Sequence, residues 1–211
     1  MANRFVGKVC LVTASTQGIG LGIALRFVQE GAKAVVICSR KKKNVDEAVK
    51  ELQTAAKEGT QVDGIVCNVS DKDQRAILIE HIKTKYGKLD VLVPNAASST
   101  HMGEQLEMTE RAYDRMWDIN VKSTFFLIAE CKDLLLAGDD GKNICIISSV
   151  TGQNPNWMLG VYAMTKAALD NMVNWLSLEL MDSGIRVTGI APGLIATEFS
   201  GAIWKNDTNL D

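Results

Sequence analysis

The sequence KVCLVTASTQGIG, residues 8–20, joins a strand-like run of apolar and β-branched residues to a turn that contains Gly18 and Gly20. A helical stretch, Ile19–Glu30, begins inside that turn. Free amides at a helix N-terminus attract phosphate, and glycine lets a pyrophosphate approach them closely. The stretch therefore predicts a dinucleotide-binding turn. Because Ile23 stands where the third glycine of the G-x-G-x-x-G pattern would be, the turn by itself is also compatible with an ordinary connection.

The rest of the chain alternates short apolar runs with helical stretches. Near-continuous apolar strands are typical of a sheet covered on both faces, and the alternation implies parallel strands with right-handed crossovers. We expect one domain over residues 1–211, a doubly wound parallel α/β sheet of the Rossmann type with strand order 3-2-1-4-5-6. The expected strands are Lys8–Thr13, Ala34–Ser39, Gln61–Cys67, Leu89–Pro94, Asn143–Ser149 and Ile185–Ala191. The expected helices are Ile19–Glu30, Val45–Lys57, Lys72–Tyr86, Glu110–Leu136 and Val161–Met181.

The composition excludes several classes of function. The net charge is −2, so no basic field indicates nucleic acid or an anionic membrane as a partner. No apolar stretch approaches the roughly 20 residues that span a bilayer, and the first residues lack a signal peptide, so we expect an intracellular protein. The chain has five cysteines, an odd number, with no Cys-x-x-Cys pair. Reduced thiols are expected rather than disulfides, and no metal site is expected.

The end of the second expected strand decides the cofactor. It reads Ser39-Arg40, where an acidic residue would hold the ribose 2′-hydroxyl of NAD. Arg40 can form charge-assisted hydrogen bonds to a 2′-phosphate, and Ser39 can add a neutral donor. The following Lys41–Lys43 would add a weaker, screened attraction, although such basic runs also occur on solvated faces. We therefore expect NADP(H) rather than NAD(H).

Four polar residues predict a reactive site. Tyr162 and Lys166 are four apart at the start of a helix, so phenol and ammonium share a face, and the cation is expected to lower the pKa of Tyr162. Ser149 ends the preceding strand, at the edge where ligands bind in parallel sheets. Asn120 lies within an apolar helix, where it is either an ordinary buried amide or a functional group. Taken singly, the Tyr162 and Lys166 spacing is also that of an exposed pair.

These motifs, in order and spacing, resemble the short-chain dehydrogenase/reductase family over essentially the whole chain. They are TASTQGIG at 13–20, PNAA at 94–97, Asn120, Ser149, Tyr162-x-x-x-Lys166 and Pro192-Gly193. The segments SRKKKNVDEA at 39–48 and APGLIATEFSGAIW at 191–204 resemble a branch that contains peroxisomal NADP-dependent carbonyl and retinal reductases. The resemblance implies an oxidoreductase that moves hydride between NADP(H) and a carbonyl or alcohol substrate, and a homo-oligomer, either dimer or tetramer.

The resemblance also implies a catalytic role for each of four residues. Tyr162 would give its proton to the carbonyl oxygen while NADPH delivers hydride to the carbon. Ser149 would hydrogen-bond that oxygen and stabilise its developing charge. Lys166 would lower the pKa of Tyr162 and hold the nicotinamide ribose, and Asn120 would anchor a water chain that resupplies protons.

The resemblance also implies that other residues bind the cofactor or the substrate. Asn95 would support the adenosine side, Asn68 would face the adenine, and the segment after the sixth strand would hold the carboxamide. The implied cofactor residues are Ser15, Thr16, Gly18, Ile19, Gly20, Ser39, Arg40, Asn68, Val69, Asn95, Ala96, Tyr162, Lys166, Pro192, Gly193, Ile195 and Thr197. Trp157, Met158 and Trp204, joined by Thr100–Met102, are expected to line a pocket for an apolar or aromatic carbonyl compound. Trp157 and Met158 have packing as an alternative role.

The chain departs from the family pattern in three places. Ala14 replaces the first glycine of the turn and Ala97 the last glycine of an Asn-Ala-Gly motif, and we expect slightly tighter packing rather than lost binding. The usual seventh strand is expected to be absent, because the sequence stops at Asp211. That ending would leave the edge of the sixth strand uncovered and leaves the location open between cytoplasm and peroxisome.

Two other readings remain. A catalytically weak or inactive NADP-binding member would act as a scaffold or regulator, and the short C-terminus favours it. A hydrolase on a similar sheet would need a nucleophile with a histidine base. His81 and His101 are expected at the surface, and no Gly-x-Ser-x-Gly motif occurs, which argues against a hydrolase.

Overall fold

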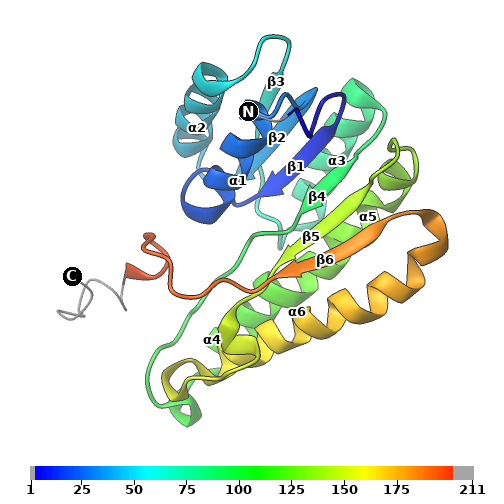
Figure 1. Cartoon of the computed structure of the whole chain (residues 1–211). Helices are drawn as coiled ribbons and strands as arrows, with labels where there is room; N and C mark the ends of the chain where they lie inside the picture. The colour runs from blue at the N-terminus through cyan, green and yellow to red at the C-terminus, as the bar shows by residue number, and fades with distance from the viewer. Residues whose placement is uncertain (1–2, 202–211) are drawn as a thin grey trace.

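The computed structural model describes residues 3–201 and contains a parallel sheet of six strands in the order β3-β2-β1-β4-β5-β6. This is the predicted doubly wound order, and all five strand pairs are parallel. In Figure 1 the carboxyl ends of the strands point to the left. The strands are β1 Val9–Thr13, β2 Ala34–Ser39, β3 Gln61–Val66, β4 Val91–Val93, β5 Asn143–Ile147 and β6 Arg186–Ile190.

Helices cover both faces of the sheet (Figure 1). Side chains of a strand alternate between faces, and β1 shows the result: Val9 and Leu11 pack in one buried cluster, Cys10 and Val12 in another. The first cluster includes residues of α3, α5 and α6, and the second includes residues of α1 and α2. The helices are α1 Gly18–Gln29, α2 Lys42–Ala55, α3 Lys72–Tyr86, α4 Glu110–Trp117, α5 Ser123–Leu136 and α6 Gly160–Glu179.

The predicted elements are found, with boundaries that shift by a few residues. The predictions of Ala34–Ser39 and Lys72–Tyr86 match the structure at both ends. The latter is defined by its caps: the Asp71 carboxylate accepts hydrogen bonds from two amides of the first turn, and Gly87 ends the helix with φ 69°. Strands were predicted too long where apolar residues continue past the last ladder pair, as at Leu89–Pro94.

The helix predicted over Glu110–Leu136 is interrupted. Residues Asp118–Lys122 form a π-helical turn between α4 and α5. Two hydroxyls follow this turn and donate to its carbonyls, Ser123 Oγ to Ile119 O at 2.6 Å and Thr124 Oγ1 to Asn120 O at 2.9 Å. Such turns are frequent at functional sites, because they redirect one side chain without ending the helix. Here the redirected residue is Asn120.

One side of the sheet is less covered than the other. α1 and α2 lie over β1, β2 and β3, whereas Cys145 on β5 is half-buried and Thr188 and Ile190 on β6 are exposed. In the described part of the chain, β6 pairs only with β5. No helix in residues 3–201 has the length and apolar character needed to cross a membrane.

Candidate active site

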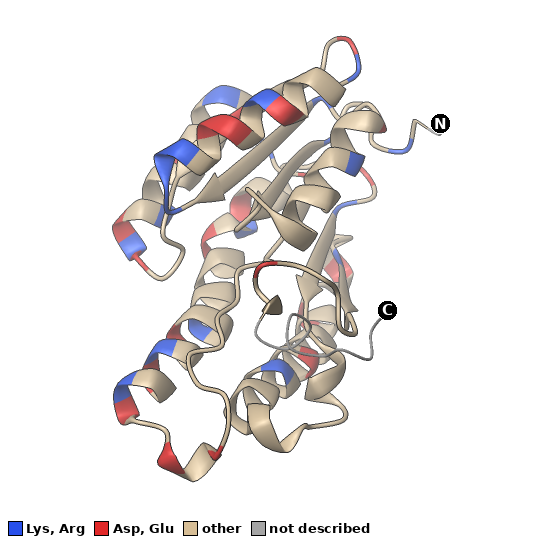
Figure 2. Cartoon of the chain, turned by 90° about the vertical axis from the view of Figure 1, so that its left-hand side faces the viewer, with Lys and Arg blue, Asp and Glu red and all other residues tan. Residues whose placement is uncertain are grey.

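The predicted site residues meet at the carboxyl ends of the strands. The glycine turn follows β1, Asn95 follows β4, Ser149 follows β5 and Pro192 follows β6. These four strands are neighbours in the sheet, so residues far apart in sequence share one rim. Figure 2 views this side and shows charges of both signs mixed over the outer helices.

Tyr162 lies in the first turn of α6 and is buried. Its hydroxyl lies close to that of Ser149, which follows β5 directly on extended backbone with φ −162°. The Ser149 Oγ also accepts hydrogen bonds from Thr151, from the hydroxyl at 2.9 Å and from the amide at 3.3 Å. Burial raises the pKa of Tyr162 to about 12, and the Ser149 hydroxyl lowers it in part. Tyr162 therefore carries its proton at neutral pH.

Lys166 is 1% exposed, and its Nζ donates a hydrogen bond to Ile147 O at 2.8 Å. The same Nζ lies 5.5 Å from the ring centroid of Tyr162, so the predicted pair shares one helix face. Burial lowers the pKa of Lys166 to about 8, and Asp170 offsets part of this effect. The expected lowering of the Tyr162 pKa by Lys166 is not seen, because burial of the phenol dominates and the ammonium is directed to the β5 backbone.

Asn120 is fully buried in the π-helical turn. Its Oδ1 accepts from Ser98 N at 2.7 Å, and its Nδ2 donates to Ser98 O and to Thr165 Oγ1, both at 3.0 Å. Thr165 Oγ1 in turn donates to Tyr162 O at 2.7 Å. The amide thus joins the loop after β4 to the helix that carries Tyr162 and Lys166. Its role as the anchor of a water chain stays a prediction.

Close packing and hydrogen bonds of Asn95 fix the conformation of the glycine turn. A Cβ on Gly20 would lie 2.6 Å from Asn95 Nδ2 and 2.8 Å from Ala14 O, so only glycine fits there. Asn95 Nδ2 donates to Thr13 O at 3.0 Å and to Ala14 O at 3.2 Å, which fixes the turn. Ser15 is fully buried, and its hydroxyl donates to Val12 O at 2.6 Å; its contact with the cofactor stays a prediction.

The predicted adenosine side lies at the ends of β2 and β3. Arg40 is exposed, and within residues 3–201 no side chain forms an ion pair or hydrogen bond with it. Ser39 is half-buried beside it. Asn68 is half-buried, and its Oδ1 accepts from Ser70 N at 3.3 Å. Val69 is buried in the cluster under α3 and α5, so its side chain faces the core rather than a ligand.

The segment after β6 folds back over the glycine turn. A Cβ on Gly18 would lie 3.3 Å from the Thr197 methyl group, so these two predicted cofactor residues are close neighbours. Pro192 is half-buried, while Gly193 and Ile195 are exposed on the same segment. The glycine turn and the segment predicted to hold the carboxamide are therefore neighbours in the structure.

The residues predicted to line the substrate pocket differ in exposure. Trp157 is 71% exposed, and Met158 is half-buried. Trp204 lies outside the described residues. An aromatic residue that the sequence analysis missed, Phe199, lies with its ring centroid 6.0 Å from that of Tyr162. It is 52% exposed, which suits a residue beside an open site.

Gln105 was also missed. Its Nε2 donates to Met158 O at 2.7 Å and to Gly103 O at 2.9 Å, and its Oε1 accepts from Val161 N at 3.0 Å. A glutamine in a polar loop carries no sequence signal for this role. These contacts hold the segment Trp157–Leu159 and the first turn of α6 together, directly before Tyr162.

The two histidines do not form a catalytic pair. His81 Nε2 lies 2.8 Å from Asp63 Oδ2 on the outer side of the sheet, and His101 Nε2 lies 2.8 Å from Glu104 O in a loop. Within residues 3–201, no group of three or more His, Cys, Asp or Glu side chains has the arrangement of a metal site. All five cysteines are free thiols, as expected.

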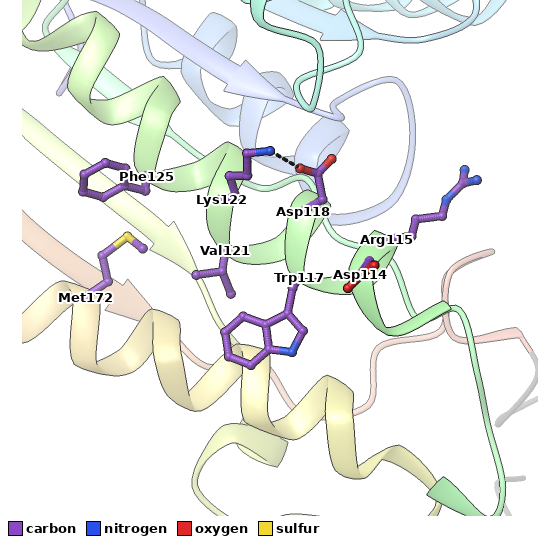
Figure 3. A pocket seen from close by; sticks show the side chains of 8 residues that line it. All are labelled: Asp114, Arg115, Trp117, Asp118, Val121, Lys122, Phe125 and Met172. Atoms are coloured by element: carbon purple, nitrogen blue, oxygen red, sulfur yellow. Dashed lines mark hydrogen bonds and ion pairs between the residues drawn. The ribbon is translucent and has the colours of Figure 1, made fainter. Parts of the chain in front are cut away.

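A hollow on the surface lies away from the catalytic residues. Figure 3 shows it between α4, the π-helical turn, α5 and α6. Its lining contains none of the predicted site residues. It consists of Asp114, Arg115, Trp117, Asp118, Val121, Lys122, Phe125 and Met172.

Comparison with known proteins identifies the family. The family profile described as short chain dehydrogenase matches residues 8–208. The chain belongs to the short-chain dehydrogenase/reductase family. It is 44% identical over 207 residues to tropinone reductase-like 3 of Erythroxylum coca, which covers 98% of this chain and 77% of that protein. It is 40% identical over 205 residues to dehydrogenase/reductase SDR family member 4 of Homo sapiens, covering 97% of this chain and 72% of that protein.

Solved short-chain dehydrogenases/reductases have the same fold. One from Mycobacterium ulcerans superposes with a TM-score of 0.90 at 28% identity, covering 98% of this chain and 74% of its own. A 3-ketoacyl-(acyl-carrier-protein) reductase from Brucella melitensis, complexed with NADH, has a TM-score of 0.85 at 26% identity. That match covers 92% of this chain and 79% of the reductase. The likeness supports an oxidoreductase that uses a nicotinamide cofactor.

The residues of this short-chain dehydrogenase/reductase fit such a cofactor. α1 has no side-chain cap at Gln17 and no acidic residue in its first turn, so its amides and positive helix end are available to a pyrophosphate. By contrast, α3 and α4 are capped by Asp71 and Thr109. Gly18 and Gly20 lie in the first turn of α1, where glycine lets a phosphate approach the backbone closely.

Proposed function

We propose that the chain is an NADP(H)-dependent carbonyl reductase that converts ketones, aldehydes or dicarbonyls to alcohols, and that catalyses the reverse reaction when alcohol is supplied. The observation that carries this proposal is the meeting of Tyr162, Ser149 and Lys166 at the rim of the sheet. The Ser149 hydroxyl is close enough to Tyr162 to lower the pKa of its phenol, and Lys166 Nζ lies 5.5 Å from the Tyr162 ring. We propose that the cofactor-binding and catalytic residues belong to one domain.

Each residue then has a step in the reaction. When bound, the nicotinamide supplies the hydride that reaches the carbonyl carbon. Tyr162, which holds its proton at neutral pH, donates that proton from Oη to the carbonyl oxygen. Ser149 Oγ donates a hydrogen bond to the same oxygen and stabilises its developing negative charge. Lys166 places a positive charge beside the phenolate that remains on Tyr162.

NADP(H) is proposed over NAD(H) because of Arg40. It is exposed at the end of β2 and has no acidic partner among the described side chains. A guanidinium at this position can bind a ribose 2′-phosphate in a bidentate manner, whereas the 2′-hydroxyl of NAD offers it no charge. A solved relative, RhlG of Pseudomonas aeruginosa, forms a complex with NADP, at 26% identity and a TM-score of 0.88.

The substrate is proposed to be an apolar or aromatic carbonyl compound. Trp157 and Met158 lie directly before the helix that carries Tyr162, and the Phe199 ring lies beside the ring of Tyr162. Trp157 and Phe199 are more than half exposed. Apolar side chains at an open rim favour a ligand that removes them from water. The name tropinone reductase-like of one relative is in line with a ketone substrate.

Turnover over a panel of carbonyl compounds tests the proposal. The purified chain is mixed with NADPH or NADH, and consumption of the reduced cofactor is followed with dicarbonyls, aromatic ketones, retinal and steroids. We expect turnover with NADPH and a lower kcat/KM with NADH. Stoichiometric NADPH binding without turnover over the whole panel would contradict the reductase proposal and favour the scaffold reading.

We also propose that the protein forms a homo-oligomer through an outer face formed by α4, α5 and α6. Tyr113, Phe125, Phe126 and Trp175 are each more than a third exposed there, and the Phe125 ring contacts those of Phe126 and Trp175. An apolar patch of this kind is typical of an interface. The adjoining hollow of Figure 3 carries Asp and Arg side chains together, so two copies related by a twofold axis can pair opposite charges.

Light scattering measures the mass of the assembly and tests this surface. We expect a dimer or tetramer for the wild-type chain and a shift to monomer for Phe125→Asp. A wild-type chain that is monomeric at all concentrations would contradict the proposal.

The five free thiols suit a reducing compartment, and we propose the cytoplasm or the peroxisome as the location.

A further inference from the structure

Asp170 is a half-buried acid for which the proposed mechanism gives no role. It lies one helical turn after Lys166 on α6, at a spacing that puts both side chains on one face. Its Oδ2 is buried and has no hydrogen-bond partner within the described residues. A carboxylate oxygen removed from water without a partner is costly, so its retention calls for an explanation.

The packing around Asp170 connects it to the catalytic residues. A Cβ on Gly152 would lie 2.9 Å from Asp170 Oδ2, and equally 2.9 Å from Lys166 C and Ala167 N. Gly152 ends the short helical turn that begins after Ser149. The absence of a side chain at Gly152 thus lets the turn that carries Ser149 rest directly on α6, with the Asp170 carboxylate at the contact.

The surroundings of Lys166 contain few charges. From β5 it meets the Ile147 carbonyl, and from α6 the phenol of Tyr162, which is neutral at pH 7. The π-helical turn packed on α6 places a neutral amide, that of Asn120, on Thr165, the residue before Lys166. Burial lowers the pKa of Lys166 because it disfavours the cation, and the negative charge of Asp170 raises that pKa. Asp170 is therefore the acid that acts on the ammonium.

We propose that Asp170 is a positioning residue whose carboxylate, held under the Gly152 turn, keeps Lys166 protonated and so keeps a cation beside Tyr162. The proposal rests on the proposed reductase function for its effect on activity, but its effect on Lys166 does not. Without this charge, the buried ammonium would give up its proton at lower pH. The pH range over which the site holds both the Tyr162 proton and the Lys166 charge would then become narrower.

The first experiment follows the protonation of Lys166 directly. Full-length chain with 13C at the lysine Cε is titrated by NMR without substrate or cofactor, and the Lys166 signal is assigned by its loss in Lys166→Met. We expect Asp170→Asn to lower the titration midpoint of Lys166 by about half a unit to one unit, a three- to tenfold change in the proton affinity. Asp170→Glu should keep the wild-type midpoint within a few tenths.

A matched control removes an acid that pairs with a lysine elsewhere. Asp46 contacts Lys42 at 2.8 Å one turn away on α2, in an exposed pair. We expect Asp46→Asn to leave the Lys166 midpoint unchanged. Asp170→Ala is the second neutral variant in case Asp170→Asn does not fold, and it carries the same expectation. A Lys166 midpoint that is the same in wild type and in the neutral Asp170 variants would overturn the proposal.

The second readout is the pH profile of the reductase. For Asp170→Asn we expect kcat/KM within about twofold of wild type at pH 6, and about three- to tenfold lower at pH 9, where fewer molecules hold the Lys166 proton. An equal loss at every pH would point to a purely structural role and contradict the proposal. If the wild-type chain has no turnover but the Lys166 midpoint shifts, the reductase function fails and the action of Asp170 on Lys166 stands.

Discussion

Tyr162 and Lys166 are both buried, and burial acts on their protons in opposite directions. It raises the pKa of the phenol to about 12 and lowers the pKa of the ammonium to about 8, because each group loses the solvation of its charged form. At neutral pH the site thus holds a proton on Tyr162 and a positive charge on Lys166. This combination suits a donor of protons to a carbonyl oxygen, which is the reductive direction.

The low pKa of Lys166 predicts a pH-dependent effect on stability. Below about pH 8 the side chain is charged in both the folded and the unfolded chain, and the folded state bears the cost of burying that charge. Above its ordinary pKa of 10.5 it is neutral in both, and the cost is gone. We expect Lys166→Met to be more stable than wild type by about 3 kcal/mol at low pH, with a difference that disappears as the pH rises.

Urea unfolding of both proteins between pH 6 and pH 11 measures this difference. Because the two proteins share all other titrating groups, the difference between their free energies of unfolding isolates the effect of Lys166. A stability difference that does not change with pH would show that the charge of Lys166 is not the cause.

Ala14 is the one non-glycine residue with positive φ, 49°, within the described chain, at the position where the family pattern has glycine. A Cβ in this region costs about 1–2 kcal/mol, while glycine adds about 0.5–1 kcal/mol of unfolded-state entropy. We expect Ala14→Gly to stabilise the protein by up to about 1 kcal/mol. The matched control is Ala137→Gly, where φ is −76° and glycine should destabilise. Equal losses in both variants, measured by urea unfolding, would exclude strain at Ala14.

Among the elements, those with local signals were predicted best. α3 was predicted at both ends because Asp71 caps its start and Gly87 its end. The interruption of the predicted Glu110–Leu136 helix was missed, since no proline or glycine marks the π-helical turn at Asp118–Lys122. Such a turn arises from tertiary hydrogen bonds of Asn120, which a sequence pattern does not contain.

The start of α6 depends on a contact from a distant loop. Gln105 donates to the carbonyls of Met158 and Gly103 and accepts from the amide of Val161. In Gln105→Glu the introduced carboxylate would face both carbonyls without a proton to donate, so its folded pKa should be raised. Stability is then present while that carboxyl is protonated and is lost as the pH rises through its folded pKa. We expect a loss of about 1–3 kcal/mol at pH 8 and a smaller one at pH 5.

Thermal unfolding of Gln105→Glu and of wild type at the two pH values measures the effect. Glu107→Gln, in the same short helix and exposed, serves as the control and should differ little from wild type. An equal loss for Gln105→Glu at both pH values would mean that its hydrogen bonds do not hold the start of α6.

In the whole molecule, the order of the strands brings the site together. The sequence predicted the sheet order and the positions of the motifs, because alternating elements and parallel strands leave few topologies. It did not predict which side chains face the rim. Phe199, for example, was not among the predicted site residues, yet its ring centroid lies 6.0 Å from that of Tyr162. Which way a loop side chain points is set by packing between distant segments.

Steady-state and binding measurements on Tyr162→Phe test the central claim most directly. The phenol of Tyr162 is proposed to be the proton donor, and its ring packs against Phe199 with the centroids 6.0 Å apart. Removing only the hydroxyl should therefore leave the fold and NADPH affinity intact, while the loss of general-acid catalysis lowers kcat by about 10²- to 10⁴-fold. A Tyr162→Phe protein that binds NADPH as wild type does and reduces carbonyl compounds at a near-normal rate would contradict the account.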